Sequence, residues 1–121
     1  MLKFYTRETL TALTNIRKGE LKFGQVANTV SSLDELKEKP QHYVLLGIPE
    51  DIGVRANYGK PGAAQAWKAA LTSLCNIQQT LYCKADNVLI LGEIDCSKQM
   101  QQAEILDTND AHYAEKLGEL V

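Results

Sequence analysis

Cysteine and histidine are scarce in this chain, and neither sign of charge predominates. Its 121 residues include three cysteines and two histidines, and 13 lysines and arginines stand against 15 aspartates and glutamates. The net charge of −2 provides no basic field that would gather nucleic acid or an anionic membrane surface. No apolar run approaches the roughly 18 residues of a membrane-spanning helix, and the N-terminal segment lacks a signal-peptide core. We therefore expect a cytoplasmic protein with neither a nucleic-acid nor a membrane partner.

The cysteines and histidines show no metal-binding or disulfide pattern. Cys75, Cys83 and Cys96 are an odd number and have no CxxC spacing, whereas a disulfide framework favours an even number and a zinc site favours closer pairs. We expect buried, reduced thiols. His42 and His112 are far apart, so we expect them to be structural or exposed, the first beginning a strand and the second lying in a helix.

The chain divides into an N-terminal segment, residues 1–40, and a longer part, residues 41–121. A hydrophobic fraction of 45% is enough to bury a core of one domain. The N-terminal segment is predicted to be helical and irregular, because Leu10, Leu13 and Ile16 lie near helical spacing and Gly19 follows as a C-terminal stop. Further along, Ser32 followed by Glu35 is a capping box, in which each side chain binds the other residue's backbone amide.

The second part predicts a strand–helix–strand unit. Residues 42–48 and 87–94 are nearly continuous apolar runs, which is typical of parallel strands covered on both faces. A helix is expected between them, over about residues 63–78, with its apolar side chains at three- and four-residue steps. These side chains are Trp67, Ala70, Leu71, Leu74 and Ile77. Together the three elements form a right-handed βαβ unit.

The last segment, residues 107–121, predicts a further helix capped by Thr108 or Asn109. Its helical pattern runs to the final residue, and two parallel strands alone would leave a bare sheet edge. We therefore expect the first βαβα portion of a larger α/β domain, apparently truncated, and self-association through the exposed edge.

The segment between the first strand and the helix, residues 47–62, is the candidate binding loop. Ligands of parallel sheets bind beyond the carboxyl ends of the strands, and four glycines here permit positive φ angles. Arg55 offers a planar fork for a carboxylate, Asn57 can donate and accept, and Lys60 adds a second cation. The glycine spacing fits neither the dinucleotide nor the P-loop motif. A surface turn with solvated charges is the alternative.

Two acidic clusters are weaker candidates. Glu93 and Asp95 lie two apart at the end of the second strand, on the same side of the backbone, and could serve acid–base or metal chemistry. The alternative is that Asp95 orders the following loop. For Asp107, Asp110 and His112, helix capping is the stronger explanation.

The stretch "DIGVRANYGKPGA", residues 51–63, resembles the corresponding loop of formimidoylglutamases, which belong to the arginase–agmatinase ureohydrolase superfamily. Lys60 stands where that family usually has arginine. "LILGEIDC" is similar to the family's next strand, with Glu93 replacing aspartate. The resemblance covers roughly residues 41–121.

The resemblance implies the N-terminal part of a three-layer α/β/α fold with a parallel sheet, and an intact enzyme with two manganese ions. That enzyme would hydrolyse N-formimidoyl-L-glutamate to glutamate and formamide, a step in histidine degradation. The family's metal-ligand motifs are absent from this sequence, and we read "DAHYA", residues 110–114, as a coincidence. No metal is therefore expected in this chain, which alone would be inactive.

The role implied for the loop is substrate binding, with Arg55, Asn57 and Lys60 at the glutamate end. Two alternatives remain. One is the specificity of an agmatinase, arginase or guanidinobutyrase, and the other is a small α/β module that binds an anionic metabolite without catalysis.

Overall fold

A mixed three-stranded sheet organises the molecule, whose computed structural model describes residues 1–40 and 43–121. The strands β1 (Leu2–Phe4), β2 (Tyr43–Gly47) and β3 (Val88–Ile94) lie in the order β1-β3-β2. β2 and β3 pair in parallel, which confirms the α/β class and the predicted parallel pair. β1 pairs antiparallel with the other side of β3 and was not predicted, because three residues are too short to show an alternating pattern.

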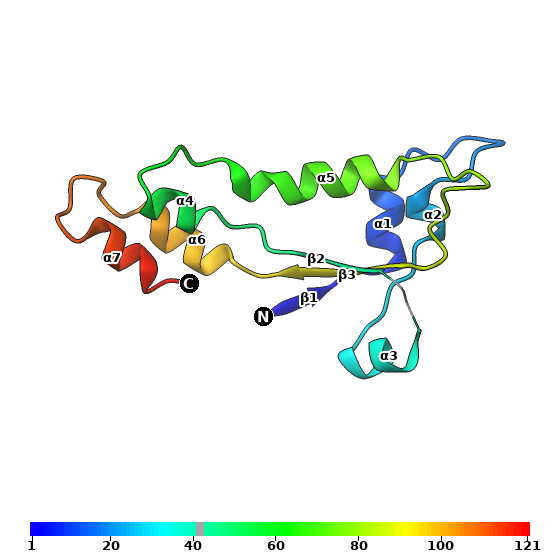
Figure 1. Ribbon diagram of the computed structural model, residues 1–121, viewed down its shortest axis with the longest axis horizontal. Coiled ribbons are helices and arrows are strands. Elements are labelled where there is room, and N and C mark those ends of the chain that lie inside the picture. The colour runs from blue at the N-terminus through cyan, green and yellow to red at the C-terminus, as the bar shows by residue number, and fades with distance from the viewer. Residues whose placement is uncertain (41–42) are drawn as a thin grey trace.

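One face of the sheet is covered by helices. Between β2 and β3 the chain forms α4 (Ile52–Ala56), the short 3-10 helix η1 (Ala63–Gln65) and α5 (Ala66–Cys75). α5 lies along the sheet together with α1 (Arg7–Leu13) and α2 (Phe23–Val26), as Figure 1 shows. Their shared core consists of Leu10, Phe23, Ala27, Leu71, Cys75, Ala85 and Ile90.

The predicted apolar face of α5 is right in part. Leu71 is buried, and Trp67 and Leu74 pack against the core. Ala70 and Ile77 are instead exposed. Ile77 lies beyond the end of the helix at Cys75, so helical spacing no longer sets its direction.

The opposite face carries α3 (Leu33–Glu38), which Figure 1 shows on the other side of the sheet from α5. The Ser32 hydroxyl accepts a hydrogen bond from the Glu35 amide at 3.1 Å, so the predicted cap is confirmed. The return bond is different, because the Glu35 carboxylate accepts from the amide of Ser31 at 2.8 Å rather than from that of Ser32.

The two apolar strands differ in burial. The residues of β3 from Leu89 to Gly92 are all buried, as predicted. β2 was expected to be covered on both faces, and this is wrong, since Tyr43, Val44 and Leu46 are exposed. The reason is topological, because β2 is an edge strand of the described sheet.

The C-terminal part adds α6 (Ser97–Glu104), which was not predicted, and α7 (Tyr113–Gly118). The last helix therefore starts later than Thr108 or Asn109, and His112 flanks it at the N-cap position rather than lying within it. α4, α6 and α7 share a small core of Ile52, Ala103, Tyr113 and Leu117. In the described part of the chain, no helix is long and apolar enough to cross a membrane.

A β-bulge interrupts β3. Leu45 pairs with Ile90 but Leu46 pairs with Gly92, so Leu91 is an extra residue on β3. Gly92 has φ 147°, and a Cβ atom there would lie 1.8 Å from the carbonyl oxygen of Lys3 on β1. Bulges re-aim the side chains that follow them, and here Glu93 accepts a hydrogen bond from the Tyr5 hydroxyl at 2.6 Å, beside Trp67 of α5.

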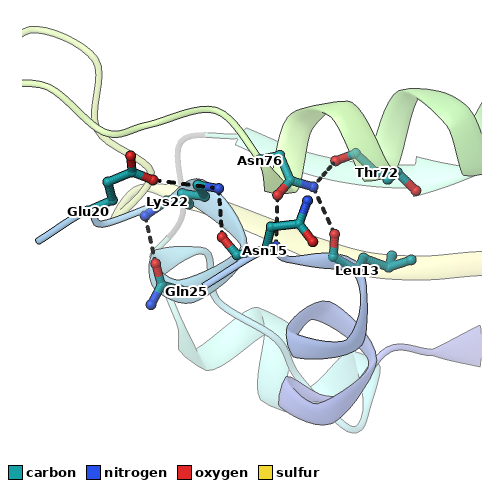
Figure 2. A network of polar contacts seen from close by, with 7 residues as sticks. All are labelled: Leu13, Asn15, Glu20, Lys22, Gln25, Thr72 and Asn76. Carbon is teal, nitrogen blue, oxygen red and sulfur yellow. Dashed lines mark hydrogen bonds and ion pairs between the residues drawn. The ribbon is translucent and has the colours of Figure 1, made fainter. Parts of the chain in front are cut away.

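A polar network fastens the end of α5 to the segment after α1 (Figure 2). The Asn76 side chain donates to the carbonyls of Leu13 and Thr72, both at 2.8 Å, and accepts from the amide of Asn15 at 2.8 Å. The ammonium of the buried Lys22 donates to the Asn15 carbonyl at 2.6 Å. The carbonyls of Thr72 and Leu13 lie in the last turns of α5 and α1, so the Asn76 amide satisfies one end carbonyl of each helix.

Candidate functional site

The predicted binding loop leaves the carboxyl end of β2, where α4, α6 and α7 gather at one end of the molecule (Figure 1). This is the end of a parallel sheet at which ligands usually bind. The loop is not wholly irregular, since α4 occupies Ile52–Ala56. Of its four glycines, Gly62 alone has a positive φ angle, 142°.

Asp51 holds the loop together. Its side chain is 2% exposed, and one carboxylate oxygen accepts from the Arg55 Nε at 2.7 Å while the other accepts from the Gly62 amide at 2.8 Å. Burial raises the pKa of this carboxyl, but the hydrogen bonds from Arg55 and Gly62 outweigh burial, so the pKa lies below its usual value. Sequence reasoning missed Asp51, although an acid four residues before an arginine was a readable signal once a helix is assumed.

The three predicted binding residues occupy different environments. Arg55 has a side chain that is 15% exposed, with Nε on Asp51 and Nη2 4.0 Å from Glu104 Oε1. Asn57 is exposed, and its amide donates to the Gly53 carbonyl at 3.3 Å. Lys60 is exposed as well. The structure therefore does not bring the three into one cluster.

Arg55 alone of these three lines a cavity between α4, α6 and α7, of about 350 Å³. The cavity combines one guanidinium, one carboxylate, two phenol rings and apolar walls. Its main lining residues are Arg55, Tyr58, Glu104, Leu106, Thr108 and Tyr113. Such a mixture of apolar walls and few polar groups is typical of small-molecule sites.

Tyr58 was not predicted and is conformationally unusual. Its amide donates to the Arg55 carbonyl at 2.9 Å, and the Gly59 amide donates to the Val54 carbonyl at 2.8 Å. These two bonds form a Schellman motif, whose left-handed residue is usually glycine. Here that residue is Tyr58, with φ 58°, and its ring lies 5.7 Å from the ring of Tyr113.

The two carboxylates at the end of β3 have separate partners. Glu93 is bound by Tyr5, whose hydroxyl also accepts from Trp67 Nε1 at 3.0 Å. Burial, followed by the bond to Glu93, raises the pKa of Tyr5 to about 12. Asp95 accepts from the amide and hydroxyl of Ser97, which lower its pKa to about 2. Asp95 therefore orders the start of α6. This agrees with the structural role that we expected as the alternative to acid–base or metal chemistry.

The acidic residues before α7 also order turns. Asp107 accepts from the Asn109 amide at 2.9 Å, and Asp110 accepts from the His112 amide at 2.8 Å and from the Lys116 ammonium at 2.6 Å. Among the described residues, no three histidine, cysteine or acidic side chains are placed to hold a metal ion. His42 lies outside the described residues.

The thiols are free, as expected, but they are not all buried. Cys75 is buried, Cys96 is partly buried and Cys83 is exposed. Cys83 is the last residue of a tight turn at residues 80–83 and lies at the surface. Burial raises the pKa of Cys75 and of Cys96, which makes both poor nucleophiles at neutral pH.

Comparison with known proteins gives a partial relationship. This chain is similar to a formimidoylglutamase. The relative comes from Aromatoleum aromaticum and is 32% identical over 88 residues, which cover 69% of this chain and 25% of the relative. The chain thus spans about a quarter of the relative's length. No family model matches the chain, and no solved structure matches it. The similarity supports a relationship with the hydrolase family that the loop motif resembles.

Proposed function

We propose that this chain contributes the substrate-binding loop to a metal-dependent hydrolase of linear amidine C–N bonds, most specifically a formimidoylglutamase. The similarity to the formimidoylglutamase of A. aromaticum carries this proposal. The position of the loop at the carboxyl end of β2 supports it independently.

In the proposed reaction, water adds to the formimidoyl carbon of N-formimidoyl-L-glutamate. The bond between that carbon and the glutamate nitrogen then breaks, the nitrogen takes a proton, and glutamate and formamide are released. Enzymes of this kind position a charged substrate before the reaction, and such positioning contributes a large part of the rate. We assign this positioning to Arg55, with Asn57 and Lys60 as secondary contacts at the glutamate end.

The two manganese ions implied by the family resemblance do not fit the described residues, which form no metal-binding group. We therefore assign no catalytic step to a metal held by this chain. The proposal places the metal ligands in sequence beyond the 88 residues that match the relative.

The proposal is tested with the complete product of the gene that encodes this sequence, supplied with manganese. We expect glutamate and formamide from N-formimidoyl-L-glutamate, and no product from arginine, agmatine or 4-guanidinobutyrate. Turnover of one of the latter instead would assign a different ureohydrolase specificity, and no turnover of any of them would reject the proposal.

Within that enzyme, Arg55→Ala should raise KM by about tenfold or more, because a carboxylate loses two charge-assisted hydrogen bonds. Lys60→Ala is the comparison variant, since the Lys60 side chain is exposed and does not line the cavity, and a smaller change in KM is expected. An unchanged KM in Arg55→Ala rejects the role of Arg55.

A binding module without catalysis is the second candidate. The cavity beside Arg55 belongs wholly to the described chain, and no metal-binding group lies among the described residues. Binding of a small carboxylate by the chain, with no hydrolysis by the complete gene product, would favour this candidate.

A further inference from the structure

The guanidinium of Arg55 is oriented but only weakly neutralised on its outer side. Asp51, almost fully buried, holds the Nε atom at 2.7 Å and so fixes the plane of the group. The outer side faces Glu104 of α6, with 4.0 Å between Nη2 and Oε1, and the Glu104 side chain is 63% exposed. An exposed ion pair at this distance is weak and screened by salt, so another carboxylate can replace Glu104.

Tyr58 supplies a wall to the same cavity at a conformational cost. A left-handed backbone is unfavourable for a bulky residue and is normally left to glycine at the end of a helix. Tyr58 as a whole residue is 68% exposed, so burial does not account for its position. Its ring instead lies against the buried Tyr113 and lines the cavity next to Arg55.

We infer that the cavity between α4, α6 and α7 is a subsite for the carboxylate end of a short aliphatic chain. The outer nitrogens of Arg55 bind the carboxylate, the methylene groups lie on the ring of Tyr58, and Glu104 is the competing anion that the ligand displaces. The identity of the natural ligand rests on the proposed function. Under that function, the ligand is a glutamate derivative whose side-chain carboxylate binds in the subsite. The amidine lies outside the cavity.

The volume and lining agree with this ligand. About 350 Å³ lies at the lower end of the range for small-molecule sites. Ala103, Leu106 and Pro61 add apolar surface, while Thr108 is the one hydroxyl besides the two tyrosines among the lining residues. A highly charged or strongly polar ligand would leave these walls unmatched.

The test titrates the isotope-labelled chain with butyrate, followed by NMR chemical shifts of the Gly59 amide and the Arg55 Nε–H. Butyramide and butylamine have nearly the same shape without the negative charge. We expect butyrate to bind at least about tenfold more tightly than butyramide, in keeping with the strength of charge-assisted bonds. Equal affinities, or shifts confined to residues away from the cavity, would overturn the subsite.

Two substitutions of glutamate test whether the ligand displaces Glu104. Glu104→Gln removes the competing carboxylate and should tighten butyrate binding about threefold or more, whereas Glu119→Gln, at an exposed position after α7, should leave it unchanged. Equal effects of the two substitutions would show only a change of net charge and would overturn the displacement of Glu104.

Tyr58→Gly tests whether the ring of Tyr58 forms a wall of the subsite. Glycine relieves the left-handed conformation while the ring contact with Tyr113 is lost, so the two effects offset and the fold should persist. Butyrate affinity should fall about fivefold. A structural tyrosine would leave the affinity unchanged, and that result would remove Tyr58 from the subsite.

These experiments are independent of catalysis. Butyrate binding at the cavity combined with a gene product that hydrolyses no amidine would leave the subsite standing and reject the proposed function. Hydrolysis of N-formimidoyl-L-glutamate without charge-selective binding at the cavity would reject the subsite alone.

Discussion

Replacing Gly92 by alanine should separate β1 from the sheet. The new methyl group would lie 1.8 Å from the Lys3 carbonyl oxygen and 3.1 Å from the Cα of Phe4. Both neighbours are backbone atoms, so no side chain can rotate to make room. A residue with a Cβ is in addition strained at φ 147°.

The expected loss of stability follows from what β1 contributes. The strained backbone conformation costs about 1–3 kcal/mol. Moving β1 away loses the pairing of Leu2–Phe4 with β3, the bond from the Tyr5 amide to the Leu91 carbonyl at 3.0 Å, and the Tyr5–Glu93 bond. Each hydrogen bond contributes about 1 kcal/mol net. The strain and the two lost bonds of Tyr5 together should lower the free energy of unfolding by about 3–5 kcal/mol, and the lost pairing of Leu2–Phe4 adds to this. The total for a typical domain is about 5–15 kcal/mol.

Urea denaturation followed by circular dichroism measures this loss, and hydrogen exchange of the Tyr5 amide reports whether β1 has separated. Gly118→Ala is the matched control, because a Cβ there meets nothing within 4 Å and the residue ends α7. It should change stability by less than about 1 kcal/mol. If Gly92→Ala cost no more than Gly118→Ala and the Tyr5 amide stayed protected, the close contact between β1 and the bulge would be refuted.

Three further outcomes are expected. The phenol of Tyr5 should ionise with a pKa of about 12 instead of 10.0. Its contribution to stability is therefore complete below pH 10 and is lost between pH 10 and about 12. Absorbance titration of wild type against Tyr5→Phe checks this, and a normal pKa for Tyr5 would contradict it. Asn76→Ala removes three hydrogen bonds and should destabilise the fold by about 2–3 kcal/mol in urea, while Asn109→Ala in an exposed turn should cost less than about 0.5 kcal/mol. Exposed β2 should cause self-association that Leu46→Lys abolishes, and a wild-type monomer at all concentrations in sedimentation would count against it.

The strand–helix–strand unit was predictable because its signals are local. The apolar run of β3 and the three- and four-residue steps of α5 depend on neighbouring residues only. The exposure of β2 was not predictable, since a run of apolar residues reads the same in a central strand and at an edge. The missed strand β1 depends on a partner about ninety residues away, as the pairing of Leu2 with Ile94 shows.

The candidate site was predictable in position but not in its contacts. The glycine-rich loop after β2 indicated where a ligand would bind, and Arg55 indicated its charge. The partners of Arg55 depend on a short helix hidden in the loop and on α6, which has no strong apolar pattern. Tyr58 could not be found, because its left-handed backbone occupies a place where the sequence pattern leads one to expect glycine.

Asp51 makes the form of the loop and the charge of the cavity inseparable. One carboxylate fastens both the cation and the returning backbone at Gly62. Replacing Asp51 by alanine would therefore release the guanidinium of Arg55 and the backbone at Gly62 in a single event. Substitutions that change ligand preference without disturbing the loop are therefore expected at Glu104 and Tyr58, on the cavity side of Arg55, and not at Asp51.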